Sequence, residues 1–259
     1  MMAKKDSHSF LPFSEKKALV IGGSGGIGRA IALGLAERGA EVTVHGGSSL
    51  ERLNSTLAAI RKAGGKGNGF LLPIKGPEAA EEIVARFSAL GTPAEPHRDP
   101  DILVCAWGPF KQGNLENLDS EFWQNMVVSN LVFPGALVSL CLGSMIRRNW
   151  GRILLFGGTN TDSIRGFTTT AAYSAAKTAL GVIVKSVAKS AGSGVTCNVV
   201  CPGLTDTEYT GKEQEHYNRE KSPGGKPLNV DQIAQLALAI LENPGVNGAI
   251  VPVDQGVVL

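Results

Sequence analysis

The segment Ala171-Ala172-Tyr173-Ser174-Ala175-Ala176-Lys177 contains a phenol and an ammonium group four residues apart. The residues around them are small and helix-compatible, so Tyr173 and Lys177 are predicted to share one face of a helix. A phenol ordinarily ionises near pH ~10, and a neighbouring cation favours the phenolate. The pair is therefore a candidate general acid/base in which Lys177 lowers the pKa of Tyr173. Because the same spacing also arises by chance, the surrounding chain decides how the pair is interpreted.

Length and composition indicate one compact α/β protein. The chain has 259 residues, of which 43% are hydrophobic, 19% are charged and 33 are glycine, as expected for a large domain with many tight turns. The net charge is only +2, and basic and acidic residues are interspersed, so no nucleic-acid partner is expected. No apolar run approaches the ~20 residues of a membrane span. Residues 1–14 are expected to form a loose arm without a signal sequence.

The cysteines lack the spacing of a zinc or redox pair, and each lies in an apolar context. We therefore expect buried free thiols, no metal site, and a reducing, cytoplasmic location. These cysteines are Cys105, Cys141, Cys197 and Cys201.

A strand, a glycine-rich loop and a helix follow one another near the N-terminus. Lys17–Ile21 is a short apolar run, the loop spans residues 22–28, and helical spacing of small and apolar residues continues to Gly39. Glycines let phosphate oxygens approach the backbone N–H groups at a helix start, where the dipole favours an anion. The loop is thus predicted to bind a dinucleotide through Gly22, Ser24, Gly26, Ile27 and Gly28.

The end of the next strand, Glu41–His45, should distinguish between dinucleotides. An acidic residue here would bind the ribose 2′-hydroxyl of NAD, but the chain has His45, Gly46, Gly47 and Ser48, with Arg52 one turn later. NADP is therefore favoured over NAD. His45 alone is equally consistent with a structural role in the loop.

The spacing of Gly22, Gly26 and Gly28, together with Tyr173 and Lys177, resembles the short-chain dehydrogenase/reductase family, in particular its 3-oxoacyl-acyl-carrier-protein reductase-like members. The resemblance extends from about Ser14 to the C-terminus. It implies hydride transfer between a nicotinamide cofactor and a carbonyl or alcohol substrate, with Tyr173 as general acid/base. The chain departs from the family pattern at Ile21 and Pro73, and Cys105-Ala106-Trp107-Gly108 replaces an Asn-Asn-Ala-Gly segment.

Further site residues follow from the same resemblance. Asn130 would hold a water that links Lys177 to solvent, and a kink is expected around it. The family's catalytic Ser is absent, and counting back from Tyr173 leaves Asn160 and Thr159 as alternatives, with Thr161 behind them. The remaining cofactor contacts would come from Ala106, Trp107 and Gly108, which follow one strand, and from Pro202, Gly203, Thr205 and Thr207, which follow another. Trp107 is equally consistent with a core or interface position.

Strands and helices alternate along the whole chain. Helices are predicted over 50–63, 77–90, about 119–130, 171–192 and 230–241, and strands over 69–74, 102–104, 151–156, 195–200 and 249–253, with a polar substrate lid over 208–228. This order predicts a single-domain, Rossmann-like, doubly wound parallel sheet of about seven strands. A homotetramer or dimer is expected through the helices of Asn130 and Tyr173, with Leu137, Leu140, Ile183 and Val187 facing outward.

Two other interpretations stay open at this level. The accumulated departures fit a degenerate family member that binds a dinucleotide or a protein partner without redox turnover. A lyase or epimerase that retains its cofactor could use the same Tyr-Lys pair.

Overall fold

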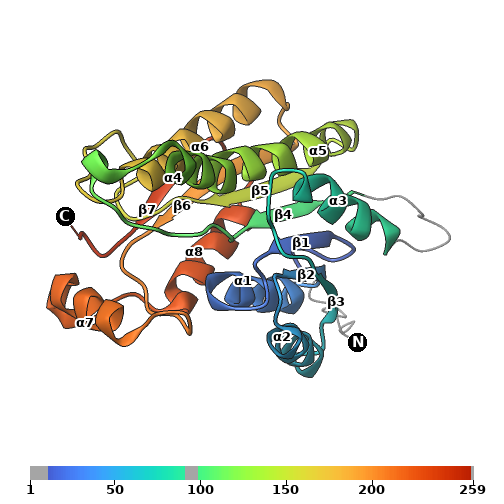
Figure 1. Ribbon diagram of the computed structural model, residues 1–259. Helices are drawn as coiled ribbons and strands as arrows, with labels where there is room; N and C mark the ends of the chain where they lie inside the picture. The colour runs from blue at the N-terminus through green and yellow to red at the C-terminus, as the bar shows by residue number, and fades with distance from the viewer. Residues whose placement is uncertain (1–10, 91–98, 258–259) are drawn as a thin grey trace, which may run out of the picture.

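The computed structural model describes residues 11–90 and 99–257. In this part of the chain a seven-stranded parallel sheet has the order β3-β2-β1-β4-β5-β6-β7 (Figure 1). β1 pairs with β2 on one side and with β4 on the other, so the chain changes winding direction there. In such sheets a crevice opens beyond the carboxyl ends of the strands at this point. The predicted doubly wound α/β fold is confirmed.

The strands are β1 (Lys17–Ile21), β2 (Glu41–Gly46), β3 (Lys66–Leu71), β4 (Ile102–Cys105), β5 (Gly151–Phe156), β6 (Val195–Pro202) and β7 (Ile250–Val253). The helices are α1 (Gly26–Glu37), α2 (Leu50–Lys62), α3 (Ala79–Ala89), α4 (Ser120–Val127), α5 (Phe133–Arg147), α6 (Ala171–Ser190), α7 (Lys212–Lys221) and α8 (Val230–Glu242).

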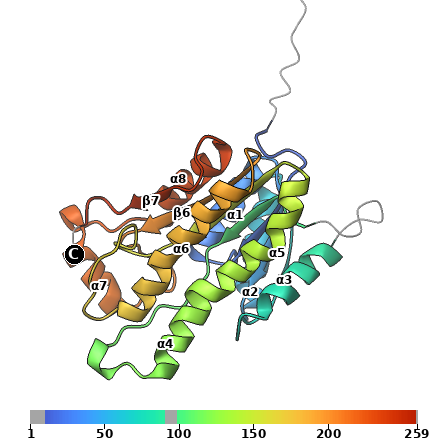
Figure 2. The same ribbon diagram turned by 90° about the horizontal axis from the view of Figure 1, so that it is seen from above.

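Helices cover both faces of the sheet. The helices α1, α2 and α8 lie on one face, and α3, α5 and α6 lie side by side on the other (Figures 1 and 2). Successive strand residues point to opposite faces: in β1, Ala18 and Val20 join the first core, whereas Leu19 and Ile21 join the second. Because both faces are buried at the centre of the sheet, β1 and β4 consist of nearly continuous apolar runs.

Some sequence-based boundaries differ from the structure. The strand predicted over 69–74 runs instead over Lys66–Leu71, where pairing with β2 overrides the weak strand propensity of its glycines and Asn68. The predicted loose arm is wrong at its C-terminal end, because Phe13 is buried and its N–H donates to Arg38 O. The segment 91–100, whose prolines and polar residues predict a loop, lies largely outside the described residues.

One helical run among the described residues, Ser120–Arg147, has the length and apolarity of a membrane span. The sequence analysis did not anticipate it. In the structure the run packs on the sheet through Phe133, Leu137 and Met145, which are buried, as in a core helix. Leu137 and Val187 therefore do not face outward as predicted, whereas Leu140 is exposed.

Candidate active site

Tyr173 and Lys177 lie on the first two turns of α6, beyond the carboxyl end of β5. The Lys177 ammonium is 5.8 Å from the centroid of the Tyr173 ring and donates a 2.8 Å hydrogen bond to the carbonyl oxygen of Phe156. The ring of Phe110 meets the Tyr173 ring edge to face, with centroids 5.0 Å apart. The predicted sharing of a helix face is confirmed, and Phe110 adds a contact that the sequence did not suggest.

Burial shifts both pKa values of the pair. It lowers the pKa of Lys177 to about 8 and raises the pKa of Tyr173 above its usual value. The predicted lowering of the Tyr173 pKa is therefore not found in this structure, because desolvation outweighs the neighbouring ammonium, which is directed at Phe156 O. At neutral pH Tyr173 is held as a phenol, which is a proton donor.

Asn130 lies in a π-helical segment, Val128–Val132, between α4 and α5. Its side-chain N–H groups donate to Met126 O at 3.1 Å and to Pro109 O at 3.0 Å. Its Oδ1 is buried and has no hydrogen-bond partner among the described residues. Such an atom requires a partner, and a water is the simplest one. The π-helical segment is an irregularity at which helices commonly kink, and the orphaned oxygen fits the predicted water.

Gly108 allows Asn130 and Lys177 to approach one another. A Cβ atom at this position would overlap Asn130 Oδ1 and would lie 2.9 Å from Lys177 Nζ. The glycine that follows β4 therefore leaves the space in which the amide oxygen and the ammonium both face the same small volume.

The residue nearest to the Tyr173 hydroxyl at the end of β5 is Gly158. A Cβ atom there would be 2.9 Å from Tyr173 Oη, closer than ordinary contacts allow. Gly158 is not among the predicted site residues. The position of the missing Ser was predicted from its distance to Tyr173 along the chain, and the loop between them has no fixed length. Counting forward from the end of the strand would have reached Gly158. No side-chain hydroxyl can therefore come from this position.

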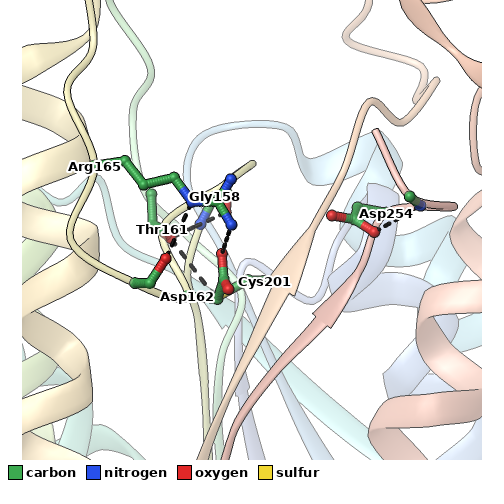
Figure 3. A network of polar contacts seen from close by, with 8 residues as sticks. Gly158, Thr161, Asp162, Arg165, Cys201 and Asp254 are labelled. Atoms are coloured by element: carbon green, nitrogen blue, oxygen red, sulfur yellow. Dashed lines mark hydrogen bonds and ion pairs between the residues drawn. The ribbon is translucent and has the colours of Figure 1, made fainter. Parts of the chain in front are cut away.

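Residues 159–161 are the predicted alternatives for the missing catalytic Ser, and their side chains have different environments. Thr161 Oγ1 bonds to the backbone of Gly158 and lies 3.6 Å from Cys201 Sγ (Figure 3). Thr159 Oγ1 donates to Pro202 O at 3.2 Å. Asn160 has a left-handed backbone, with φ of 59°, and lines the cavity. Within the described part of the chain no hydrogen bond engages its side chain, so its amide is available to a ligand.

A cavity of about 980 Å³ joins these groups. It extends to Ile27 in the glycine loop, to the segment that follows β4 and to the segment that follows β6. Trp107 borders it while packing edge to face on Phe133, with centroids 5.3 Å apart. The predicted residues that line the cavity are Ile27, Ala106, Trp107, Gly108, Thr159, Asn160, Tyr173, Lys177, Pro202, Gly203, Thr205 and Thr207.

The glycine loop has the backbone that its glycines favour and is covered by Glu208 and Tyr209. Gly22 and Gly26 have positive φ, and a Cβ atom at Gly28 would overlap Gly22 O. Gly26 N donates a 2.8 Å hydrogen bond to the carboxylate of Glu208. The Tyr209 hydroxyl lies directly against Gly25. A carboxylate thus takes the position at the helix start that suits a phosphate oxygen.

The end of β2 is divided between buried and open residues. His45 is buried, its Nε2 lies 2.9 Å from Leu72 O, and burial lowers its pKa to about 4. This enclosure favours the structural alternative for His45. Gly47 and Ser48 are exposed. Arg52 lies one turn later, with its guanidinium 5.1 Å from the centroid of the Tyr209 ring.

The described residues fit a nicotinamide dinucleotide. The glycine loop already holds an anionic group, the orphaned Asn130 Oδ1 faces Lys177, and Asn160 and Tyr173 border the same cavity. Among described residues no cluster of histidine, cysteine or acidic side chains could hold a metal. The four cysteines are free and buried.

Known proteins share this architecture. A family model described as short chain dehydrogenase matches residues 16–218. The 3-oxoacyl-[acyl-carrier-protein] reductase FabG of Escherichia coli is 34% identical over 199 residues, covering 76% of this chain and 77% of that protein. The 2-dehydro-3-deoxy-D-gluconate 5-dehydrogenase of Bacillus subtilis is 30% identical over 257 residues, covering 96% and 97%. A structure of actinorhodin polyketide ketoreductase with NADPH aligns with a TM-score of 0.81 and 27% identity, covering 95% and 98%.

These matches and the geometry agree with one another. The strand order, the glycine loop and the paired Tyr173 and Lys177 occur together with a family match over most of the chain. The chain belongs to the short-chain dehydrogenase family, close to its 3-oxoacyl-acyl-carrier-protein reductases, and is an oxidoreductase that acts on alcohol or carbonyl groups.

Proposed function

We propose that this protein reduces a small-molecule carbonyl compound with NADPH, and that Tyr173 donates the proton. The observation that carries the proposal is the pairing of buried Lys177 with partly exposed Tyr173 at a cavity that also contains the free amide of Asn160. The neutral phenol of Tyr173 can give a proton to a developing alkoxide, which suits the reductive direction.

Each side chain has a distinct role in this proposal. The bound nicotinamide supplies the hydride. Tyr173 Oη gives its proton to the developing alkoxide, and the Asn160 amide donates a hydrogen bond to the same oxygen. Lys177 holds positive charge beside the phenol. A water at Asn130 Oδ1 relays a proton from solvent toward Lys177 and Tyr173.

The preference for NADPH rests on the open segment after β2. Gly47, Ser48 and Arg52 offer hydroxyl and guanidinium donors to a 2′-phosphate, and no acidic residue occupies positions 45–50. The NADPH in the ketoreductase structure named above supports the same choice. Titration of the protein with NADPH and NADH, followed by fluorescence, should give the lower dissociation constant for NADPH.

Location and assembly are further parts of the proposal. Free, buried cysteines favour a reducing compartment, the cytoplasm. The exposed apolar side chains Val132, Leu140 and Val182 on the outer surfaces of the helical layer favour a homo-oligomer. Residues 208–228, which contain α7, form the substrate lid.

The test is the substitution Tyr173→Phe. We expect turnover on carbonyl substrates to fall by about 10³-fold or more, since the proton donor is lost, while NADPH binding is unchanged. NADPH oxidation across a panel of ketones and fluorescence titration measure the two properties. A Phe variant with full activity would refute the role of Tyr173. Wild-type protein that binds NADPH but reduces nothing would point instead to a degenerate family member.

A further inference from the structure

The cavity contains a cation that the proposed mechanism does not use. Its charged lining residues are Lys177, which serves the reaction, and Arg165, which lies in the loop between β5 and α6. None of the described residues that line the cavity is acidic. Two cationic side chains thus border the substrate space, where they favour an anionic ligand.

Arg165 retains most of its hydrogen-bonding capacity. Its Nε donates to Ser163 Oγ at 3.0 Å, and one terminal nitrogen forms an ion pair with Asp162 Oδ1 at 3.8 Å, a distance too long for a hydrogen bond (Figure 3). A guanidinium has five N–H donors in a planar fork that matches a carboxylate. The side chain is 42% exposed, so its remaining donors are accessible to a ligand.

The rest of the lining also suits a small polar anion. The run Thr168-Thr169-Thr170 and Gln112 line the cavity with hydroxyl and amide groups, and Phe110 and Phe167 add aromatic surface. Arg165 and Asn160 belong to the same loop, which leads from β5 to Tyr173. One substrate molecule can therefore present its carbonyl to Asn160 and Tyr173 and another group to Arg165.

We propose that Arg165 binds the carboxylate of an oxo-acid substrate whose carbonyl lies at Tyr173 and Asn160. The inference rests on the proposed carbonyl reduction and names the class of its substrate. Arg165 acts as a specificity residue, since it contacts the substrate away from the reacting carbon.

The experiment compares methyl-ketone acids with their methyl esters. Pyruvate, acetoacetate, levulinate and 5-oxohexanoate differ in the separation of the carbonyl from the carboxylate, and each ester keeps the carbonyl but lacks the charge. For the acid that spans the site, kcat/KM should exceed that of its ester by about tenfold or more, the effect of one charged hydrogen bond. Arg165→Gln should remove this advantage and leave the ester unchanged. Arg61→Gln, an exposed site on α2, is the matched control.

The inference is overturned if Arg165→Gln leaves the acid-to-ester ratio unchanged at every chain length. Calorimetry of the same acids with the protein, with and without NADP⁺, measures binding independently of turnover. Acid binding that is lost in Arg165→Gln supports the inference even if no acid is reduced, and in that case only the proposed reaction fails. Absence of acid binding, or binding unaffected by the substitution, overturns the inference.

Discussion

The two ends of the cavity are built differently. At the catalytic end, Tyr173 and Lys177 are fixed on α6, enclosed by the sheet and the π-helical segment, and their pKa values are shifted by burial. At the phosphate end, a two-residue contact from the lid, Glu208 and Tyr209, covers a loop whose ligand groups are backbone N–H groups.

The difference predicts which property a substitution changes at each end of the cavity. The catalytic end holds desolvated groups in a fixed geometry, so changes there should act on the chemical step. The phosphate end must exchange a carboxylate for a cofactor phosphate, so changes there should act on cofactor affinity. Three substitutions test this contrast, in order of expected effect.

Lys177→Met should abolish most activity and should also change the pH dependence of stability. Loss of the ammonium beside the phenol is expected to lower kcat by about 10³-fold. The folded pKa of Lys177, about 8, lies below that of an unfolded lysine, 10.5, so the unfolded wild-type chain binds more protons between these values. Wild-type stability relative to the Met variant should therefore rise by about 3 kcal/mol as pH increases through this window.

Urea unfolding of both proteins without cofactor, at several pH values from 7 to 10.5, measures this difference. The four buried cysteines and Tyr173 are common to both proteins, but Cys105 and Cys201 interact with the Lys177 charge, so the measurement is repeated with both replaced by alanine in each protein. A difference that does not vary with pH would mean that Lys177 is not desolvated as the structure indicates.

Asn160→Gly should lower kcat by about 10²-fold with little change in NADPH affinity, because it removes one donor to the alkoxide. Glycine suits the left-handed backbone of Asn160, so the variant avoids the strain that alanine would add. Thr159→Val is the matched control, since its hydroxyl is already bonded to Pro202 O. Steady-state kinetics and NADPH titration distinguish the two. A larger loss of kcat in Thr159→Val would transfer the role to Thr159.

Sequence reasoning predicted the first strand, the glycine loop and the helix of Tyr173 and Lys177 because their signals are local. The apolar run Lys17–Ile21, the glycine loop and the four-residue spacing of Tyr173 and Lys177 each specify a short structure on their own. The unusual environment of Asn130 required the family resemblance, since a buried amide in a helix gives no such signal by itself.

The features that sequence reasoning missed depend on contacts between distant segments. Gly158 meets Tyr173 through a loop of unspecified length, and Glu208 is 182 residues from Gly26. Likewise, the Lys66–Leu71 strand is fixed by its pairing with β2, and burial, not the nearby charge, determines the direction of the Tyr173 pKa shift. None of these can be derived from neighbouring residues alone.

Glu208→Gln should have the smallest effect and should act on cofactor binding. In the proposed function, Glu208 and a cofactor phosphate compete for the N–H of Gly26. The apparent affinity for NADPH is therefore lowered in proportion to the fraction of molecules in which Glu208 occupies this N–H. An amide keeps the size but loses the charge that the helix start favours, which weakens the contact by about 0.3–1 kcal/mol. The dissociation constant for NADPH should therefore fall by about two- to fivefold, with kcat unchanged.

Fluorescence titration at low and moderate salt measures this change, and Glu213→Gln, an exposed position on α7, controls for the loss of one negative charge from the lid. The gain for Glu208→Gln should shrink as salt screens the carboxylate. Equal affinities for wild type and Glu208→Gln would mean that the contact with Gly26 does not oppose binding. A fall in kcat instead would break the contrast, because it would make Glu208 part of the catalytic end.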